Sequence, residues 1–157
     1  MAMGHSRSGG SYVGNSEGHA SRAYFDLGGG VYVTTGSDIA PLDIHVRKYD
    51  RGVPTQRGAV LSLEQWSELR DQRFLVDEFL QTIERDKQNM LTCHLGSHLF
   101  VEVNKAYRGV DLRHWDWNSK TKSVLPSKKG ILLSVEQWQK LKSCIDTIPD
   151  SKLKYTE

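Results

Sequence analysis

Residues 54–66, Pro-Thr-Gln-Arg-Gly-Ala-Val-Leu-Ser-Leu-Glu-Gln-Trp, recur further along the chain as residues 126–138, Pro-Ser-Lys-Lys-Gly-Ile-Leu-Leu-Ser-Val-Glu-Gln-Trp. Both stretches keep the Pro, the Gly, a Leu-Ser pair and the Glu-Gln-Trp triplet, and both have a basic residue before the Gly. Agreement over so many positions predicts that the chain contains an internal duplication.

The similarity extends upstream of these two blocks, with a smaller spacing between the matched positions. The matched segments are Leu27-Gly28 with Leu95-Gly96, Tyr32-Val33 with Phe100-Val101, and Leu42-Asp43-Ile44 with Val110-Asp111-Leu112. The change of spacing predicts four additional residues between Leu112 and Pro126, in the polar run 116–123, where an insertion is tolerated. We expect a disordered Gly/Ser-rich tail at 1–22, a first unit at 23–89 and a second at 90–157.

Composition limits the kind of protein that this chain can be. No apolar run is long enough to span a membrane, and no secretory signal is apparent, so we expect a soluble intracellular protein. Cys93 and Cys144 occupy non-equivalent places in the repeat, which favours reduced thiols. Units of this size would each be marginally stable alone, so we expect the two copies to pack against each other.

Each copy has the sequence pattern of antiparallel strands followed by one amphipathic helix, which predicts an α+β fold. Ser62 and Ser134 occupy N-cap positions, with Gln65 and Gln137 three residues later, the spacing of a capping box. We expect the first helix to run for about 20 residues with an apolar stripe, and the second to stop before Pro149. The stripe of the first helix consists of Trp66, Leu69, Phe74, Val76, Phe79, Leu80 and Ile83. The expected strands are 31–35, 42–47 and 58–61 in the first copy, and 99–103, 110–115 and 130–133 in the second.

Strand alternation places cations and aromatic side chains together on the outer face of each sheet. If Val110 and Leu112 point inward, then Arg113, Trp115 and Trp117 point outward, and in the first copy His45, Arg47 and Tyr49 do so. This combination suits unpaired nucleic acid, because bases stack on aromatic rings while cations contact phosphates. The second copy has 11 Lys and Arg against 7 Asp and Glu, the first 8 against 11, so we expect the second to dominate binding. The alternative is that these aromatic residues cover a second apolar face or a subunit contact.

The repeated block, preceded by a Leu-Gly strand and an aliphatic-Asp-aliphatic strand, resembles the carboxy-terminal domain of the transcriptional coactivator positive cofactor four. The resemblance covers each copy from its Leu-Gly strand to its helix. It implies a dimer of four-stranded antiparallel sheets, each followed by a helix, that binds single-stranded or melted DNA in transcription and genome maintenance. It therefore implies a nuclear protein whose partners are such DNA and also transcription factors or RNA polymerase components.

The resemblance also implies which residues contact nucleic acid. Arg57 and Lys129 would lie at the DNA channel, and Arg113 would match the family's third-strand Arg. The family's aromatic positions would correspond to Tyr107 and to either Trp115 or Trp117. In the first copy the third-strand Arg position is either His45 or, with a two-residue shift, Arg47. The complete candidate set is Arg47, Tyr49, Arg51, Arg57, Tyr107, Arg108, Arg113, Trp115, Trp117, Lys120, Lys122, Lys128 and Lys129.

Other functions have weaker support in the sequence. Strand alternation sends Cys93 and His94 to opposite faces, which argues against a zinc site, and the run Leu27-Gly28-Gly29-Gly30 precedes a strand, as in a turn. No arrangement of nucleophile, base and orienting group suggests an enzyme, and we expect no cofactor. A protein-interaction module of the transcription machinery with little direct DNA binding is the main alternative. We expect a monomer in which the two units form an intramolecular pseudo-dimer, with a two-chain assembly as the alternative.

Overall fold

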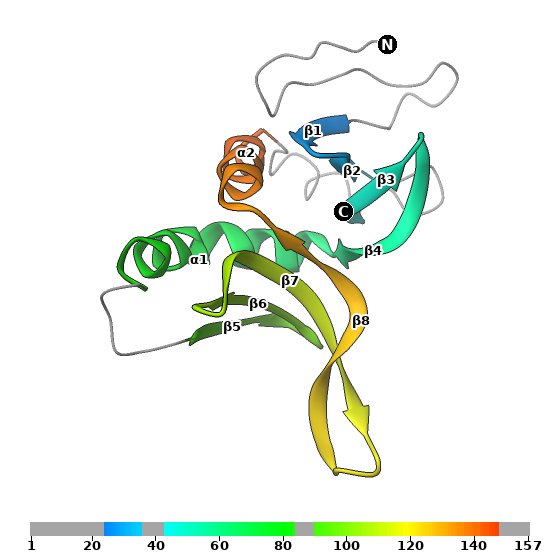
Figure 1. The fold of residues 1–157 in the computed structure, drawn as a ribbon, viewed down its shortest axis with the longest axis vertical. Helices are drawn as coiled ribbons and strands as arrows, with labels where there is room; N and C mark the ends of the chain where they lie inside the picture. Colours follow the sequence, from blue (N-terminus) through cyan, green and yellow to red (C-terminus); the bar gives the residue numbers. More distant parts are fainter. Residues whose placement is uncertain (1–23, 36–42, 84–89, 148–157) are drawn as a thin grey trace.

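The computed structural model describes residues 24–35, 43–83 and 90–147, and they form two units with the same order of elements, four strands and a helix (Figure 1). The first unit contains β1 (Tyr24–Gly28), β2 (Val31–Thr35), β3 (Ile44–Asp50), β4 (Val53–Leu61) and α1 (Leu63–Thr82). The second contains β5 (Met90–Gly96), β6 (Leu99–Asn104), β7 (Tyr107–Asn118), β8 (Ser123–Leu133) and α2 (Val135–Ile145). Each sheet is an antiparallel meander with its strands in sequence order. The predicted α+β fold with two tandem units is confirmed.

Both helices begin at the predicted capping boxes. Ser62 Oγ accepts a hydrogen bond of 3.1 Å from the Gln65 amide, and Gln65 Oε1 accepts one of 2.9 Å from the Ser62 amide. Ser134 and Gln137 repeat both bonds at the same lengths. The reciprocal pair satisfies two amide groups that have no partner within the helix. The first helix has 20 residues, as predicted, and the second has 11 and ends before Pro149.

Each helix packs against the sheet of the other unit. Helix α1 lies against β5 and β6, and α2 lies against β1 (Figure 1). The side chain of each capping-box glutamine fixes this exchange, because Gln65 Nε2 donates to the Gly96 carbonyl at 2.8 Å and Gln137 Nε2 donates to the Gly28 carbonyl at 2.9 Å. Each helix start is therefore tied to the turn after the first strand of the other unit, and the two units share one core.

That shared core contains both tryptophans of the repeat, Trp66 and Trp138, each at most 1% exposed. Burial of two such rings is a large apolar contribution to stability. The helices also contact each other through Asp77 of α1, which accepts a 2.7 Å hydrogen bond from Trp138 Nε1 and pairs with Lys142. A second ion pair joins Arg73 to Asp146 at 3.1 Å. The two helices therefore pack together, as the sequence predicted.

The strand register corrects the predicted alignment of the two units. Ile44 lies opposite Leu61 in the same way that Val110 lies opposite Leu133, so Ile44 is equivalent to Val110 and not to Leu112. The third strands are therefore aligned two positions away from the predicted match. The β7–β8 hairpin is longer than the β3–β4 hairpin by six residues instead of four, and the connection before the third strand is two residues shorter. The two-residue shift keeps the period of two, which is why the sequence pattern did not reveal it.

Two further expectations need correction. Phe74, placed in the apolar stripe of the first helix, is 69% exposed, and the Arg73 guanidinium lies 4.9 Å from its ring centroid. The final strands are also longer than the predicted segments 58–61 and 130–133, because β4 begins at Val53 and β8 at Ser123.

In the described part of the chain, neither helix could cross a membrane. The predicted disordered tail, 1–22, lies outside the described residues.

Candidate nucleic-acid interface

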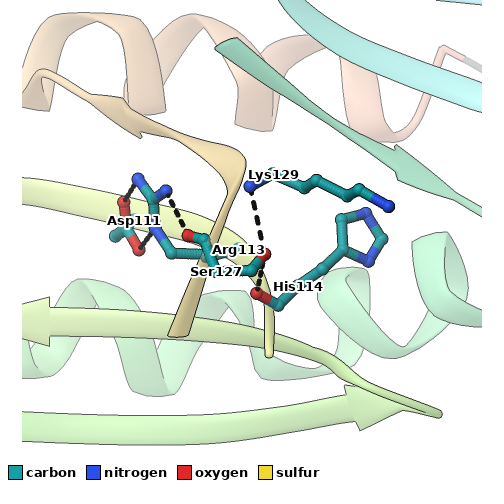
Figure 2. A network of polar contacts seen from close by, with 5 residues as sticks. All are labelled: Asp111, Arg113, His114, Ser127 and Lys129. Atoms are coloured by element: carbon teal, nitrogen blue, oxygen red, sulfur yellow. Dashed lines mark hydrogen bonds and ion pairs between the residues drawn. The ribbon is translucent and has the colours of Figure 1, made fainter. Parts of the chain in front are cut away.

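An arginine in the third strand of the second unit is held against a bulge in the fourth strand (Figure 2). Arg113 Nη1 donates to the Ser127 carbonyl at 2.9 Å. The Ser127 hydroxyl donates to the His114 carbonyl at 2.7 Å and accepts from the Lys129 amide at 3.0 Å. The bulge arises because Arg113 pairs with Gly130 and Trp115 with Pro126, so three residues of β8 lie opposite His114 alone.

The first unit repeats this arrangement bond for bond. Arg47 Nη1 donates to the Thr55 carbonyl at 2.8 Å, and the Thr55 hydroxyl donates to the Lys48 carbonyl at 2.7 Å. The same hydroxyl accepts from the Arg57 amide at 3.2 Å. Arg47 therefore occupies the position of Arg113, and the choice that the sequence left open between His45 and Arg47 is settled in favour of Arg47.

The glycine shared by the two repeated blocks makes room for that arginine. A Cβ atom added to Gly130 would lie 2.7 Å from Arg113 Cγ and 2.7 Å from the Leu112 carbonyl oxygen. A Cβ atom added to Gly58 would lie 2.8 Å from Arg47 Cζ. A side chain at either position would displace the arginine that crosses the strand, which accounts for the glycine in both repeated blocks.

The two arginines differ in their anionic partners. Both Arg113 Nε and Arg113 Nη2 donate to the Asp111 carboxylate at 2.9 Å, and Asp111 is only 6% exposed. The hydrogen bond from Arg113 to Asp111 raises the pKa of Arg113 above its ordinary value, although burial of the guanidinium opposes this. In the first unit, His45 occupies the position of Asp111. Arg113 is therefore fixed and partly neutralised, whereas Arg47 has no carboxylate at the matching position.

Aromatic rings contact one another beside these arginines on the outer face of each sheet. In the second unit the Phe100 and Trp115 ring centroids are 4.9 Å apart, and His94 stacks on Phe100 at 4.7 Å. In the first unit Tyr32 and Tyr49 meet edge to face at 5.5 Å. A hollow lined by Tyr24, Tyr32, Tyr49, Arg51 and the glycines 30 and 52 lies at this pair. The candidate set omitted Tyr24, Tyr32, His94 and Phe100, although the period-two pattern of the first and second strands could have placed them on the same face.

The six additional residues of the second unit extend the β7–β8 hairpin into an arm that projects from the body of the molecule (Figure 1). We call residues 117–124 the arm. Trp117 is 61% exposed and pairs with Val124 across it. Lys120 and Lys122 lie in the turn, where Lys122 adopts a positive φ of 56° and donates its amide to the Asn118 carbonyl at 2.7 Å. The arm thus presents an exposed aromatic ring and two lysines.

Tyr107 and Arg108, at the start of β7, are brought to different places. The pKa of the Tyr107 phenol is raised by burial and by Glu102 and Asp111, and lowered by Arg113, so Tyr107 lies on the outer face near that arginine. Arg108 instead lines a cavity between the helices and the β6–β7 hairpin, together with Lys105, Asp77 and Lys142. The structure therefore separates Arg108 from the other candidate residues.

The remaining cations gather where β4 lies beside β8. Lys128 and Lys129 line a hollow there with Arg47 of the other unit, while Arg57, the counterpart of Lys129, is exposed nearby on β4. Cationic groups from both units thus approach one another across the junction. The described surface combines stacked rings with cations, as a surface for unpaired nucleic acid would.

No curated protein and no solved structure matches the chain significantly. Residues 93–144, which run from β5 to α2 and make up about a third of the chain, do match a family model. The family is described as Transcriptional Coactivator p15 (PC4), so the second unit is similar to a domain of that family.

Proposed function

We propose that this chain binds single-stranded or melted DNA without sequence preference and acts in the nucleus as a transcriptional coactivator or in genome maintenance. The observation that carries the proposal is the repeated frame in which Arg47 and Arg113 are each held beside a pair of aromatic rings in contact. Exposed rings provide stacking surfaces for bases, and cations contact phosphates, so the combination favours unpaired strands over duplex. The family match of the second unit supports the same function.

We further propose that the two units arose by duplication and act as an intramolecular pseudo-dimer. The exchanged helices support this, since each unit covers the sheet of the other within one chain. Light scattering coupled to size exclusion tests the assembly directly. A mass near 17.8 kDa is expected, and a mass near twice that value would contradict a single-chain pseudo-dimer.

Fluorescence anisotropy with labelled oligonucleotides tests DNA binding. We expect single-stranded and bubble forms to bind at micromolar concentration or tighter, more strongly than duplex of the same length. Affinity should fall steeply between about 50 and 200 mM salt, because binding releases counterions from the phosphates. Absence of binding to every form at low salt would exclude the proposal and leave the protein-interaction module.

A matched pair of variants tests whether the second unit dominates. Lys128 and Lys129 occupy the positions of Gln56 and Arg57, so the pair in the second unit carries one more positive charge than the pair in the first. The double variant Lys128→Ala with Lys129→Ala should weaken binding more than Gln56→Ala with Arg57→Ala. Its salt slope should also fall by about two, against about one for the matched variant. Equal losses would show that the units contribute equally.

One observation favours the protein-interaction alternative. Phe74 and Leu75 of α1 are 69% and 45% exposed, which is unusual for large apolar side chains on a helix that packs against a core. If the DNA assays are negative, this part of α1 is the first surface to test. The substitution Phe74→Ser should then abolish capture of a transcription-machinery partner without lowering the free energy of unfolding by more than about 0.5 kcal/mol.

A further inference from the structure

The hollow at the junction of β4 and β8 is built from both units. Its lining is Arg47, Gln56, Gly58 and Val60 from the first unit and His114, Lys128 and Lys129 from the second. Three of these side chains are permanently cationic at neutral pH and none is acidic. A hollow of this charge suits a compact anion with several acceptor oxygens, such as a phosphodiester.

His114 is the residue that connects the two units at this point. Its Nε2 atom accepts a hydrogen bond of 3.3 Å from the Val60 amide of β4. A nitrogen that accepts a hydrogen bond carries no proton, so the ring is neutral in this arrangement. The His114 ring and the Lys129 side chain extend in the same direction, away from the pair of Arg113 and Asp111 (Figure 2).

The surroundings of His114 keep the free ring neutral at physiological pH. Burial lowers its pKa below the ordinary value of histidine, and Lys129 on β8 lowers it further. Arg47 on β3 and His98 in the β5–β6 turn act in the same direction, and only Asp116 on β7 opposes them. Val60, on β4, contributes an amide and no charge. The ring therefore lies among cations that a bound anion would offset.

We propose that this hollow is a phosphodiester subsite shared by the two units, and that His114 takes up a proton when the phosphate of a DNA strand enters it. The inference rests on the proposed DNA binding and adds to it a named subsite and a proton linkage. A phosphate oxygen can accept the hydrogen bond of the Val60 amide in place of the imidazole nitrogen. The imidazolium then donates to a second phosphate oxygen, so the Val60 amide keeps a hydrogen-bond partner.

The first unit has no equivalent of this proton-linked group. Lys48 occupies the position of His114, since its carbonyl receives the same hydrogen bond from the fourth-strand bulge. The Lys48 ammonium donates to the Gly29 carbonyl at 2.6 Å, in the turn between β1 and β2. Each chain should therefore take up one proton when phosphate binds, on His114, and no second proton on the equivalent residue of the first unit.

The sign of the pH dependence follows from linkage. The bound phosphate raises the pKa of His114 relative to its pKa in the free protein. At a pH between the pKa of the free protein and that of the complex, the complex therefore binds more protons than the free protein. Affinity must then rise as the pH falls through the pKa of the complex, with a limiting slope of about tenfold per pH unit, and level off below the pKa of the free protein.

The test is fluorescence anisotropy with labelled oligothymidylate, whose bases do not titrate in the range used, at constant ionic strength between about pH 5.5 and 8. The expected result for the wild type is an affinity gain of about tenfold on acidification, set by the one-proton slope. His114→Gln, which can still accept from the Val60 amide, should bind with a change of no more than about twofold over the range. His98→Gln, the matched change at an exposed neighbour, should keep the wild-type slope.

Each outcome decides one of the two proposals. If the wild type and His114→Gln bind with the same pH slope, the proton-linked subsite is wrong and DNA binding stands. If the wild type does not bind at any pH, the proposed function fails and the subsite fails with it. Nuclear magnetic resonance of the wild-type His114 ring gives an independent measurement that needs no variant. The pKa of this ring should rise when oligothymidylate is added, and an unchanged value would overturn the inference.

Discussion

The two units share a hydrogen-bonded frame but differ in what surrounds it. Arg47 and Arg113 make the same bond to the fourth-strand bulge, at 2.8 and 2.9 Å. Around Arg113 the chain has a buried aspartate and a longer hairpin, whereas around Arg47 it has a histidine and a tight turn at Arg51 and Gly52. The comparison shows that the repeated sequence encodes the frame, while the residues outside it set the properties of each face.

At the junction of β4 and β8 the two units again share backbone hydrogen bonds and differ in the contacts of their side chains. His114 and Lys48 have equivalent backbone bonds, yet His114 reaches the Val60 amide of the other unit and Lys48 reaches the Gly29 carbonyl of its own. The pseudo-symmetry therefore holds for the backbone and is lost for the side chains where the units meet. Matched substitutions in the two units therefore separate what the shared frame contributes from what its surroundings contribute.

The largest difference should appear when Asp111 and the residue at its position in the first unit, His45, are each replaced by alanine. Asp111→Ala leaves Arg113, whose side chain is 24% exposed, without its carboxylate partner. Loss of one member of a mostly buried ion pair should cost about 3 kcal/mol of unfolding free energy. His45→Ala at the equivalent position should cost less than about 1 kcal/mol. Urea denaturation followed by circular dichroism measures both, and equal costs would show that Asp111 has no special role.

The glycine beneath each arginine should respond unequally to alanine. In Gly130→Ala the new methyl meets the Leu112 carbonyl oxygen as well as Arg113, so the backbone must shift. In Gly58→Ala the three nearest atoms all belong to the Arg47 side chain, and two of them, Cγ and Cζ, can move when that side chain rotates. We expect a loss of about 2 kcal/mol for Gly130→Ala and about half of that for Gly58→Ala, the range of overpacking. Chemical denaturation of the two variants checks this, and the reverse order would contradict the contact analysis.

Shortening the arm should affect binding more than stability. Replacing residues 117–124 by Arg-Gly, the turn of the first unit, removes Trp117, Lys120 and Lys122 but no core residue. Oligonucleotide affinity should fall about tenfold, from one stacking ring and two phosphate contacts. The unfolding free energy should change by less than about 1 kcal/mol. If affinity is retained, the arm has no role in DNA binding.

Much of this architecture could be predicted because the signals are local. The Ser-x-x-Gln spacing marks both helix starts, and alternation assigns Val110 and Leu112 to the core. The alignment of the third strands could not be predicted, because a shift of two residues leaves every side chain on the same face. The strand pairing reveals it, because Arg47 lies opposite Gly58 in the same way that Arg113 lies opposite Gly130.

Less of the candidate site could be predicted from the sequence, because its residues come together through tertiary contacts. The contact of His114 with Val60 joins residues of different units, and no spacing rule relates them. Arg108 was included among the candidate residues together with its neighbour Tyr107, yet alternation sends its side chain to the cavity beside the helices. Phe74 was placed in the core because its spacing is helical, although α1 packs on the other unit with a different face.

The smallest expected difference concerns the two buried tryptophans. Trp138 Nε1 donates to Asp77 at 2.7 Å, whereas Trp66 Nε1 is buried with no hydrogen-bond partner among the described residues. Both substitutions replace the indole by a smaller phenyl ring. Trp138→Phe also removes a hydrogen bond to a carboxylate, whereas Trp66→Phe also removes a buried N–H donor that lacks an acceptor. Trp138→Phe should therefore cost about 1 kcal/mol more, the net value of one buried hydrogen bond. Thermal and urea unfolding monitored by circular dichroism measure the difference, with Asp77→Asn as the control that keeps an acceptor for Trp138. If Trp66→Phe proves the costlier change, then the hydrogen bond from Trp138 Nε1 to Asp77 is not what makes the two tryptophans differ in their contribution to stability.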